Sequence, residues 1–179
     1  IESIPVGAFR FNPDTAKLQY WDGNQFVNIT TTSPEQHTGG TRGLIVGGRS
    51  NGSGRNNIQF VNMDTTSNFS DFGDLDENKR VPIAMGNRVE GRICGGLSGS
   101  YSNAVDKIVI ASKGNGVNTV DLTESVYNGA AIASSTRAIR AGGDNGSGES
   151  NVIDYMTFGN DQNFVDFGDL FDDRQSCGG

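Results

Sequence analysis

A segment of twenty residues occurs three times in this chain, and no other feature restricts the fold as strongly. The copies are Asn56–Leu75, Asn103–Leu122 and Asn151–Leu170. Each copy follows a Gly-Gly pair that ends an apolar run, and both landmarks recur after 47 or 48 residues. Two landmarks that keep one spacing define an internal repeat. A period of this length predicts a solenoid, a propeller or an array of repeats.

Short strand-like runs fill each repeat and are separated by turn signals, which indicates antiparallel sheet. Glycine contributes 26 of the 179 residues, and Asn, Ser, Thr and Asp are frequent, which favours short strands with tight turns over helices. Four strands in roughly 45 residues is the size of one propeller blade. We therefore expect an all-β fold of the β-propeller type, with four-stranded blades over residues 41–87, 88–135 and 136–179.

The third repeat is shorter than the other two. Val81–Met85 and Ala130–Ala133 are expected to be fourth strands, and the corresponding place in the third repeat falls at Gly178. We therefore expect the last blade to be incomplete, with an edge open to pairing. Three blades are also fewer than the usual four to eight of a propeller. The alternatives are an unusually small ring, a ring completed by another chain and a piece of a longer array; association between chains is favoured.

Residues 1–30 are expected to form a separate three-stranded β-meander. Its strands are the aromatic and β-branched runs Ala8–Phe11, Leu18–Trp21 and Phe26–Ile29, and Asp22-Gly23 is a hairpin signal. So small a sheet buries little surface and needs a surface to pack against. Residues 31–40 are polar, contain a proline and end in a glycine pair, which predicts a linker between two domains.

Charge and composition argue against several classes of function. The net charge is −7 and the basic residues are scattered, so we expect no nucleic-acid partner. No apolar run is long enough to cross a membrane, and the first residues do not resemble a signal peptide. The single histidine, His37, lies in the linker, which argues against histidine-rich metal sites and histidine catalysis. We interpret Cys94 as a small buried apolar residue, and a disulfide with Cys177 is the alternative.

The aspartates at one position of each repeat are the most suggestive chemistry: Asp74, Asp121 and Asp169. They could line an axis and hold a cation, but a turn role is the simpler interpretation, because a hard cation needs about six converging oxygens. The segment Asp144–Glu149 does not have EF-hand spacing. We expect no metal site and no cofactor.

Three Ser/Gly/Asn-rich loops, 49–55, 97–102 and 144–150, are the best candidates for a binding surface, because loops on a rigid scaffold commonly carry binding residues. The candidate residues are Arg49, Asn51, Arg55, Ser100, Tyr101, Asp144, Asn145 and Glu149.

Two parts of the chain resemble bacteriophage virion surface proteins. The N-terminal stretch GAFRFNPDTAKLQYWDGNQFVNI resembles a segment common in tail-fibre and other particle proteins. The repeats, with STRAIRAGG, NVIDYMTF and DFGDL, resemble the kelch-like repeats of virion proteins of marine phages, cyanophages among them. The resemblance implies kelch-like blades and a structural role on the particle surface. It implies no catalytic residues.

We therefore expect a virion structural protein and not an enzyme, most simply a tail-fibre-like component for host attachment; a capsid decoration protein is the alternative. Residues 1–30 would dock on other virion proteins, the loops would contact a host receptor or glycan, and the chain would self-associate, with a trimer favoured. A glycan-cleaving enzyme is less favoured, and its paired carboxylates would have to be Asp71/Asp74 or Asp166/Asp169. A cellular kelch adaptor is also less favoured.

Overall fold

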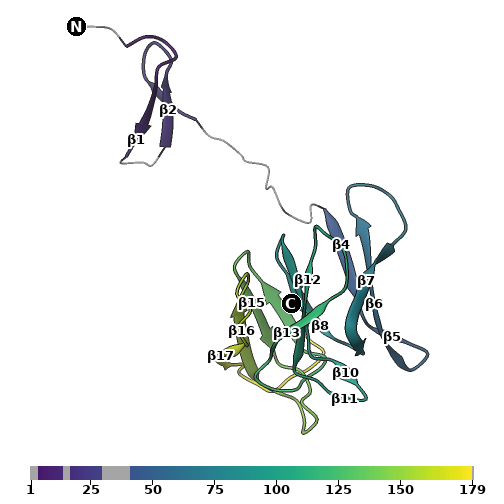
Figure 1. Cartoon of the computed structure of the whole chain (residues 1–179). Coiled ribbons are helices and arrows are strands. Elements are labelled where there is room, and N and C mark those ends of the chain that lie inside the picture. The colour runs from purple at the N-terminus through teal and green to yellow at the C-terminus, as the bar shows by residue number, and fades with distance from the viewer. Residues whose placement is uncertain (1–3, 14–16, 30–40, 179) are drawn as a thin grey trace. The chain divides into compact units, whose positions relative to one another are not determined.

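The computed structural model describes residues 4–13, 17–29 and 41–178 (Figure 1). The described residues form strands and turns, so the fold is all-β with antiparallel sheets, as expected. The chain divides into two compact units, Ile1–Gln36 and His37–Gly179. The predicted linker, with the one histidine, lies outside the described residues.

The first unit is a three-stranded antiparallel sheet of β1 (Phe9–Asn12), β2 (Lys17–Trp21) and β3 (Phe26–Asn28), in the order β1-β2-β3. Asp22 makes the β2–β3 turn, because its Oδ1 accepts the backbone N–H groups of Asn24 and Gln25, both at 2.8 Å. These two hydrogen bonds lower the pKa of Asp22. The chemistry is that of an Asx turn.

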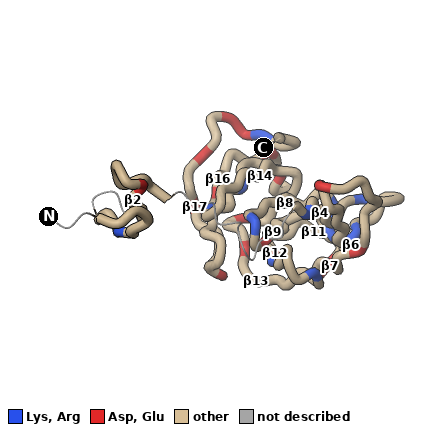
Figure 2. Tube along the Cα trace, turned by 90° about the horizontal axis from the view of Figure 1, so that it is seen from above, with Lys and Arg blue, Asp and Glu red and all other residues tan. Residues whose placement is uncertain are grey.

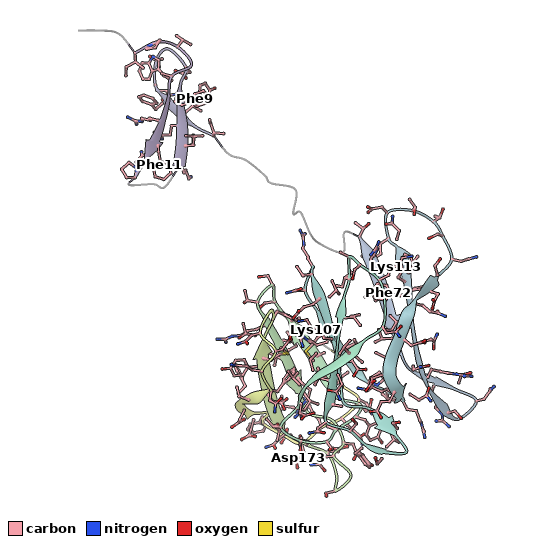
Figure 3. All side chains as sticks on the ribbon, viewed as in Figure 1. Phe9, Phe11, Phe72, Lys107, Lys113 and Asp173 are labelled. Carbon is pink, nitrogen blue, oxygen red and sulfur yellow. The ribbon has the colours of Figure 1, made fainter. Side chains whose placement is uncertain are left out.

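The two faces of this small sheet differ. On one face Arg10 donates to Gln19, and Gln19 donates to Asn28 across the three strands. The other face is apolar and exposed; it is formed by two cross-strand pairs, Phe9 with Tyr20 and Phe11 with Leu18 (Figure 3). A sheet with one uncovered apolar face has a surface available for docking.

The second unit contains three sheets of four strands each, which we call sheets I, II and III. Sheet I contains β4 (Arg42–Val46), β5 (Arg49–Ser50), β6 (Ser53–Asn62) and β7 (Ser70–Lys79). Sheet II contains β8 (Ile83–Gly86), β9 (Glu90–Cys94), β12 (Ala104–Val109) and β13 (Val117–Asp121). Sheet III contains β14 (Ala130–Ala133), β15 (Arg137–Ala141), β16 (Val152–Thr157) and β17 (Val165–Asp169).

The strand pairing corrects the expected repeat boundaries by one strand. Val81–Met85 and Ala130–Ala133 were predicted to end the first and second repeats, but the strands observed there, β8 and β14, pair with β9 and β15 and so begin sheets II and III. The last sheet therefore has four strands, and the prediction that it is incomplete is wrong. In sheet I the strand that corresponds to β9 and β15 is β4, and β4 is an edge strand.

The three sheets are arranged in sequence order, with β16 and β17 at one end and β6 and β7 at the other (Figure 2). One apolar cluster joins sheets I and II, where Ile58, Phe72 and Leu75 pack against Ile93 and Ile108. A second cluster joins sheets II and III, with Val105 and Val120 on one side and Ala138, Met156 and Phe164 on the other. Sheet II is therefore covered on both faces, whereas sheets I and III are each covered on one.

Charged side chains are also buried between the sheets. Lys79 of sheet I lies 3.4 Å from Asp106 of sheet II, so this ion pair joins the two sheets. Arg92 of sheet II donates to Glu90 of the same strand. It also donates to Asp161 in the β16–β17 turn, and this contact joins sheet II to sheet III. Each buried charge has an opposite charge beside it, as a low-dielectric interior requires.

The Gly-Gly pairs end β4, β9 and β15, and both glycines of each pair have positive φ, between 58° and 115°. The N–H of the second glycine always binds a carbonyl near the end of the same repeat: Gly48 to Lys79, Gly96 to Val126 and Gly143 to Arg174. The first glycine is also confined, since a Cβ on Gly95 would lie 2.2 Å from the carbonyl oxygen of Val126. Backbone conformation and close approach together require glycine here.

Candidate functional site

The three predicted binding loops lie at one end of the sheets. They join corresponding strands, β4 to β6, β9 to β12 and β15 to β16, so they leave the sheets at the same end; we call residues 47–53, 95–103 and 142–151 the loop end. The short strands β5, β10 (Leu97–Ser98) and β11 (Ser100–Tyr101) mark this end at the bottom of Figure 1.

The first loop is a tight hairpin. Asn51 and Gly52 have φ values of 50° and 84°, the pattern of an Asn-Gly hairpin turn. Arg49 is exposed on β5, opposite Gly54. Arg55 is exposed, and its backbone N–H is held by the carbonyl of Gly48. Of the three predicted residues, Asn51 thus has a clear conformational role, and the two arginines present their charge at the surface.

A polar groove of about 440 Å³ separates the first loop from the second. Its walls are Gly52–Gly54 on one side and Leu97–Gly99 on the other, with Asn78 and Arg80 between them. The backbone of Arg80 pairs with Leu97 in both directions, at 3.0 and 3.1 Å, which fixes the second loop to the end of sheet I. Arg80 therefore belongs to the candidate site, although the sequence interpretation did not include it.

Tyr101 connects the second loop to the third. Its ring lies 5.4 Å from that of Tyr127 in an edge-to-face arrangement and covers Gly146, where an added Cβ would come within 3.0 Å of the ring. Partial burial, followed by the charge of Asp144, raises the pKa of Tyr101. The structure thus brings together Tyr101 and Asp144, two of the predicted residues from different repeats.

The third loop holds its own backbone. Asp144 Oδ1 accepts the N–H of Gly146 at 2.8 Å, and Asn145 Oδ1 accepts the N–H of Ser147 at 3.0 Å. Glu149 pairs with Asp144 in a β-bridge and accepts a 3.4 Å hydrogen bond from Gln175. These side-chain oxygens therefore hold the loop's own backbone and neighbouring residues in place.

Glu124 anchors this loop from below. Its carboxylate accepts hydrogen bonds from Ser150 at 2.6 Å, Arg140 at 2.9 Å and Asn145 at 3.1 Å. Burial, the largest single influence, raises the pKa of Glu124, but these donors together outweigh it and the net shift is downward. The ionised carboxylate is therefore the form that the structure stabilises.

The residues that sequence reasoning missed could have been found from the repeat. Arg80, Tyr127 and Gln175 occupy one repeat position, 47 and 48 residues apart. The first two of them form a backbone bridge to the loop of the next repeat, to Leu97 and to Asp144. Their side chains differ so much in chemistry that composition alone did not indicate a shared position.

The repeated aspartates do not converge. Asp74, Asp121 and Asp169 lie on β7, β13 and β17, which are the edge strands of three different sheets. The pairs considered for glycan cleavage lie on two of these strands, and Asp166 accepts the N–H of Gly168 in its own strand. Within residues 4–13, 17–29 and 41–178 no three His, Cys, Asp or Glu side chains gather closely enough to hold a metal ion. The same residues contain no helix long and apolar enough to span a membrane.

Both cysteines are free thiols, so the alternative of a disulfide between them is excluded. Cys94 is fully buried in the cluster between sheets II and III, and burial raises its pKa to about 12. Cys177 is only partly buried.

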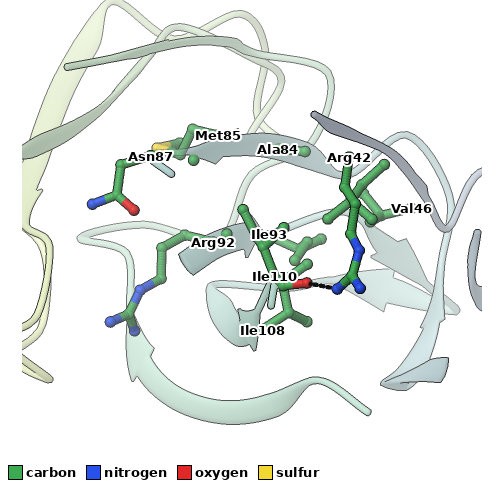
Figure 4. Close-up of a pocket in the computed structure, with 12 residues that line it drawn as sticks. Arg42, Val46, Ala84, Met85, Asn87, Arg92, Ile93, Ile108 and Ile110 are labelled. Atoms are coloured by element: carbon green, nitrogen blue, oxygen red, sulfur yellow. Dashed lines mark hydrogen bonds between the residues drawn. The ribbon is translucent and has the colours of Figure 1, made fainter. Parts of the chain in front are cut away.

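A second hollow, of about 280 Å³, lies away from the loop end, between β4 of sheet I and strands β8, β9 and β12 of sheet II (Figure 4). Val46, Ile93 and Ile108 give it an apolar lining, and Arg42 closes one side by donating to the carbonyls of Ile110 and Ala111 at 2.6 and 2.7 Å.

Comparisons with known proteins support the fold only. No family model and no curated protein matches the sequence. Among solved structures the fold is well represented, with 116 matching chains. One of them is the structure of YjhT, to which the chain is 8% identical, with a TM-score of 0.61 over 89% of this chain and 60% of that one. This chain therefore spans less than two thirds of that neighbour and shares with it an all-β architecture.

Proposed function

We propose that this chain is a structural protein of a phage particle, displayed on the surface, and that its loop end attaches to a host surface receptor or glycan. In this proposal the three sheets are kelch-like blades of the β-propeller type. The proposal is supported by three successive four-stranded sheets, by the glycine-pair hydrogen bonds that recur in each of them, and by the sequence resemblance to virion proteins.

The single observation that carries the binding function is the geometry at Tyr101. The exposed ring of Tyr101 lies beside the carboxylate of Asp144 in the neighbouring loop, and both loops are fixed by hydrogen bonds to the sheets. Rigid loops lose little entropy on binding, and an aromatic ring with a polar neighbour suits contact with a sugar or a peptide. Many copies on one particle would make weak contacts effective through multivalency.

The first unit supports a docking role. Its apolar face is exposed, while the opposite face is closed by hydrogen bonds between side chains. We propose that this face packs on another virion protein, so that residues 1–30 act as the adaptor.

Binding is tested with the fluorescently labelled chain on an array of bacterial surface polysaccharides and on intact marine cyanobacterial cells. We expect retention on at least one surface, and about a tenfold loss of affinity for Tyr101→Ala, which is on the order of 1–2 kcal/mol. Val89→Ala is the control, since Val89 is exposed in the β8–β9 turn at the opposite end of sheet II. Equal losses for both variants, or retention on none of these surfaces, would refute the attachment function.

The position on the particle is tested by immunogold electron microscopy of purified phage with an antibody against residues 41–179. Gold at the tail supports attachment, and gold over the head supports capsid decoration. Particles that carry no label would refute the virion assignment.

A further inference from the structure

The two sheet interfaces inside the chain are built from the same parts. In each, the turn before the last strand of one sheet reaches back to the edge strand of the sheet before it. Asn115 Oδ1 accepts the backbone N–H of Asp74, and Asn163 Oδ1 accepts that of Asp121, both at 3.0 Å. The next residue of each turn donates its N–H to the carbonyl of the same aspartate, at 2.8 and 2.9 Å. We call this repeated contact, in which a turn binds the edge strand of the preceding sheet, a dock.

Sheet I carries the turn side of a third dock. Asn68-Phe69 precedes Leu75 by the same number of residues as Asn163-Phe164 precedes Leu170. Phe164 is 4% exposed, because it inserts between sheets II and III, whereas Phe69 is 45% exposed. The same two residue types thus stand at the same place in the repeat, and the phenylalanine is buried between two sheets in one case and exposed in the other.

Sheet III carries the edge-strand side of that third dock. In sheet I, Phe60 and Phe72 form an edge-to-face pair 6.2 Å apart, and Arg42 lies over Phe60. Sheet II covers this face, and its Lys113 also lies over Phe60. Phe72 and Lys113 are labelled in Figure 3. The corresponding residues of sheet III repeat this arrangement: Tyr155 and Phe167 form a pair 5.5 Å apart, with Arg137 over Tyr155.

The difference between the two aromatic pairs is what covers them. Phe72 is 4% exposed, and Phe167 is 52% exposed. The exposed face of sheet III thus has the same kinds of side chain as the face of sheet I that is buried against sheet II. Large exposed apolar faces of this kind mark interaction sites.

The opposite end of the unit has the matching face. Ile45 of sheet I corresponds to Ile93 of sheet II, since each lies two residues before its glycine pair. Ile93 is 1% exposed, because it packs on sheet I, whereas Ile45 is 55% exposed. Val61 corresponds in the same way to the buried Ile108. The two outer faces therefore correspond, by repeat position, to the two sides of the interfaces inside the chain.

We propose that a second copy of this chain covers these faces, with sheet III of each copy packed on sheet I of the other, so that two copies close a ring of six sheets. In this contact Asn68 of one copy accepts the N–H of Asp169 of the second copy, and Phe69 inserts as Phe164 does. The interface is heterologous, and a heterologous contact closes into a ring or continues as a filament according to its rotation. Six sheets fall within the four to eight of known propellers.

Charge supports the same orientation. Arg42 donates to the carbonyls of Ile110 and Ala111 of the next sheet, and the corresponding positions in sheet I are Met63 and Asp64. Arg137 of one copy therefore meets Asp64 of the second copy, a residue of opposite charge. This contact uses only the second unit, so it is independent of the attachment function and of the docking proposed for residues 1–30.

The test is the molar mass of the full chain by light scattering at micromolar to tens of micromolar concentration. We expect twice the chain mass of 19.0 kDa, unchanged on further concentration. Phe69→Asp should give the monomer with an unchanged circular dichroism spectrum, because Phe69 is exposed in the single chain. Phe9→Asp is the control, since Phe9 is an exposed phenylalanine of the other unit, and this variant should keep the dimer.

Complementation identifies which faces meet. Phe167→Asp should also be monomeric, and a mixture of Phe69→Asp with Phe167→Asp should recover a dimer through its one intact interface. Asp64→Arg and Arg137→Asp should each weaken the dimer, and the double variant should restore it. A monomeric wild-type chain, a mass that grows with concentration, or loss of the dimer in Phe9→Asp but not in Phe69→Asp would overturn the proposal.

Discussion

Replacement of Asp154 by alanine tests how the buried charges hold the sheets together. Asp154 and Arg140 are both fully buried; Oδ1 lies 2.7 Å from Nε, and Oδ2 accepts from Nη2 at 2.8 Å. Oδ2 also accepts the N–H and the hydroxyl of Thr123, at 3.0 and 2.5 Å, which ties the end of sheet II to sheet III. One carboxylate therefore satisfies a buried cation and two donors from another sheet.

The expected loss follows from what alanine leaves behind. Removal of one partner of a buried ion pair costs about 3–5 kcal/mol, because the other charge stays buried without compensation. Glu124 still holds one nitrogen of Arg140 at 2.9 Å, which places the loss near the lower end of that range, at about 3 kcal/mol. A double variant, Arg140→Met with Asp154→Leu, removes both charges and keeps the volume, so it should cost less than Asp154→Ala alone.

The assay is urea unfolding followed by circular dichroism, with the free energy of unfolding taken by linear extrapolation. Asp173→Ala is the control, since Asp173 is an exposed carboxylate of the same unit (Figure 3) and its loss should stay within about 0.5 kcal/mol. The reasoning is refuted if Asp154→Ala loses less than about 1 kcal/mol, or if the double variant is less stable than the single one.

Three further outcomes follow from the same interior. Gly95→Ala should destabilise the chain by more than Gly99→Ala in urea unfolding: both have positive φ, which costs an L-residue about 1–2 kcal/mol, but only at Gly95 would the Cβ meet a carbonyl, at 2.2 Å. Because the pKa of Glu124 is lowered in the folded chain, its carboxylate stabilises the fold above pH 4.5, and this stabilisation is lost as the pH falls through the lower folded pKa. Glu124→Gln should therefore weaken the dependence of the urea unfolding midpoint on pH in the acidic range. An unchanged dependence in this range would contradict the argument. Iodoacetamide at pH 8 should label Cys177 and leave Cys94 unlabelled until urea is added, as intact-mass measurement would show, because burial raises the pKa of Cys94 to about 12.

The repeat period predicted the number of sheets but not which four strands each contains. A tandem repeat has no intrinsic start, so Val81–Met85 could be grouped with the strands before it or after it. The structure decides through the turns. Asn87 Oδ1 accepts the N–H groups of Val89 and Glu90, which makes a tight hairpin between β8 and β9. Ser134 Oγ does the same for the β14–β15 turn. These polar turn residues were the local signal for the correct grouping.

The position of the candidate loops could be predicted from sequence, whereas their mutual contacts could not. Ser/Gly/Asn-rich segments at fixed offsets identify connections at one end of a repeated sheet. The contact of Tyr101 with the third loop depends on how far sheet III is rotated against sheet II, a quantity with no sequence pattern. The burial of Lys79, Arg92 and Arg140 could not be predicted either. A charged side chain is expected to be exposed unless its partner, here from another repeat, is known.

One substitution within the repeat distinguishes the inner interfaces from the outer face. Asp106 and Asp154 each accept an N–H from the sheet before, from Asp76 at 3.4 Å and from Thr123 at 3.0 Å, and each has a buried cation beside it. The corresponding residue of sheet I is Gln59, which is exposed. An amide oxygen can accept the same hydrogen bond, and it costs far less to desolvate than a carboxylate. A neutral acceptor therefore suits the face that is bare in the single chain and buried when a second copy binds, whereas the charged acceptors stay inside interfaces that never open in the folded chain.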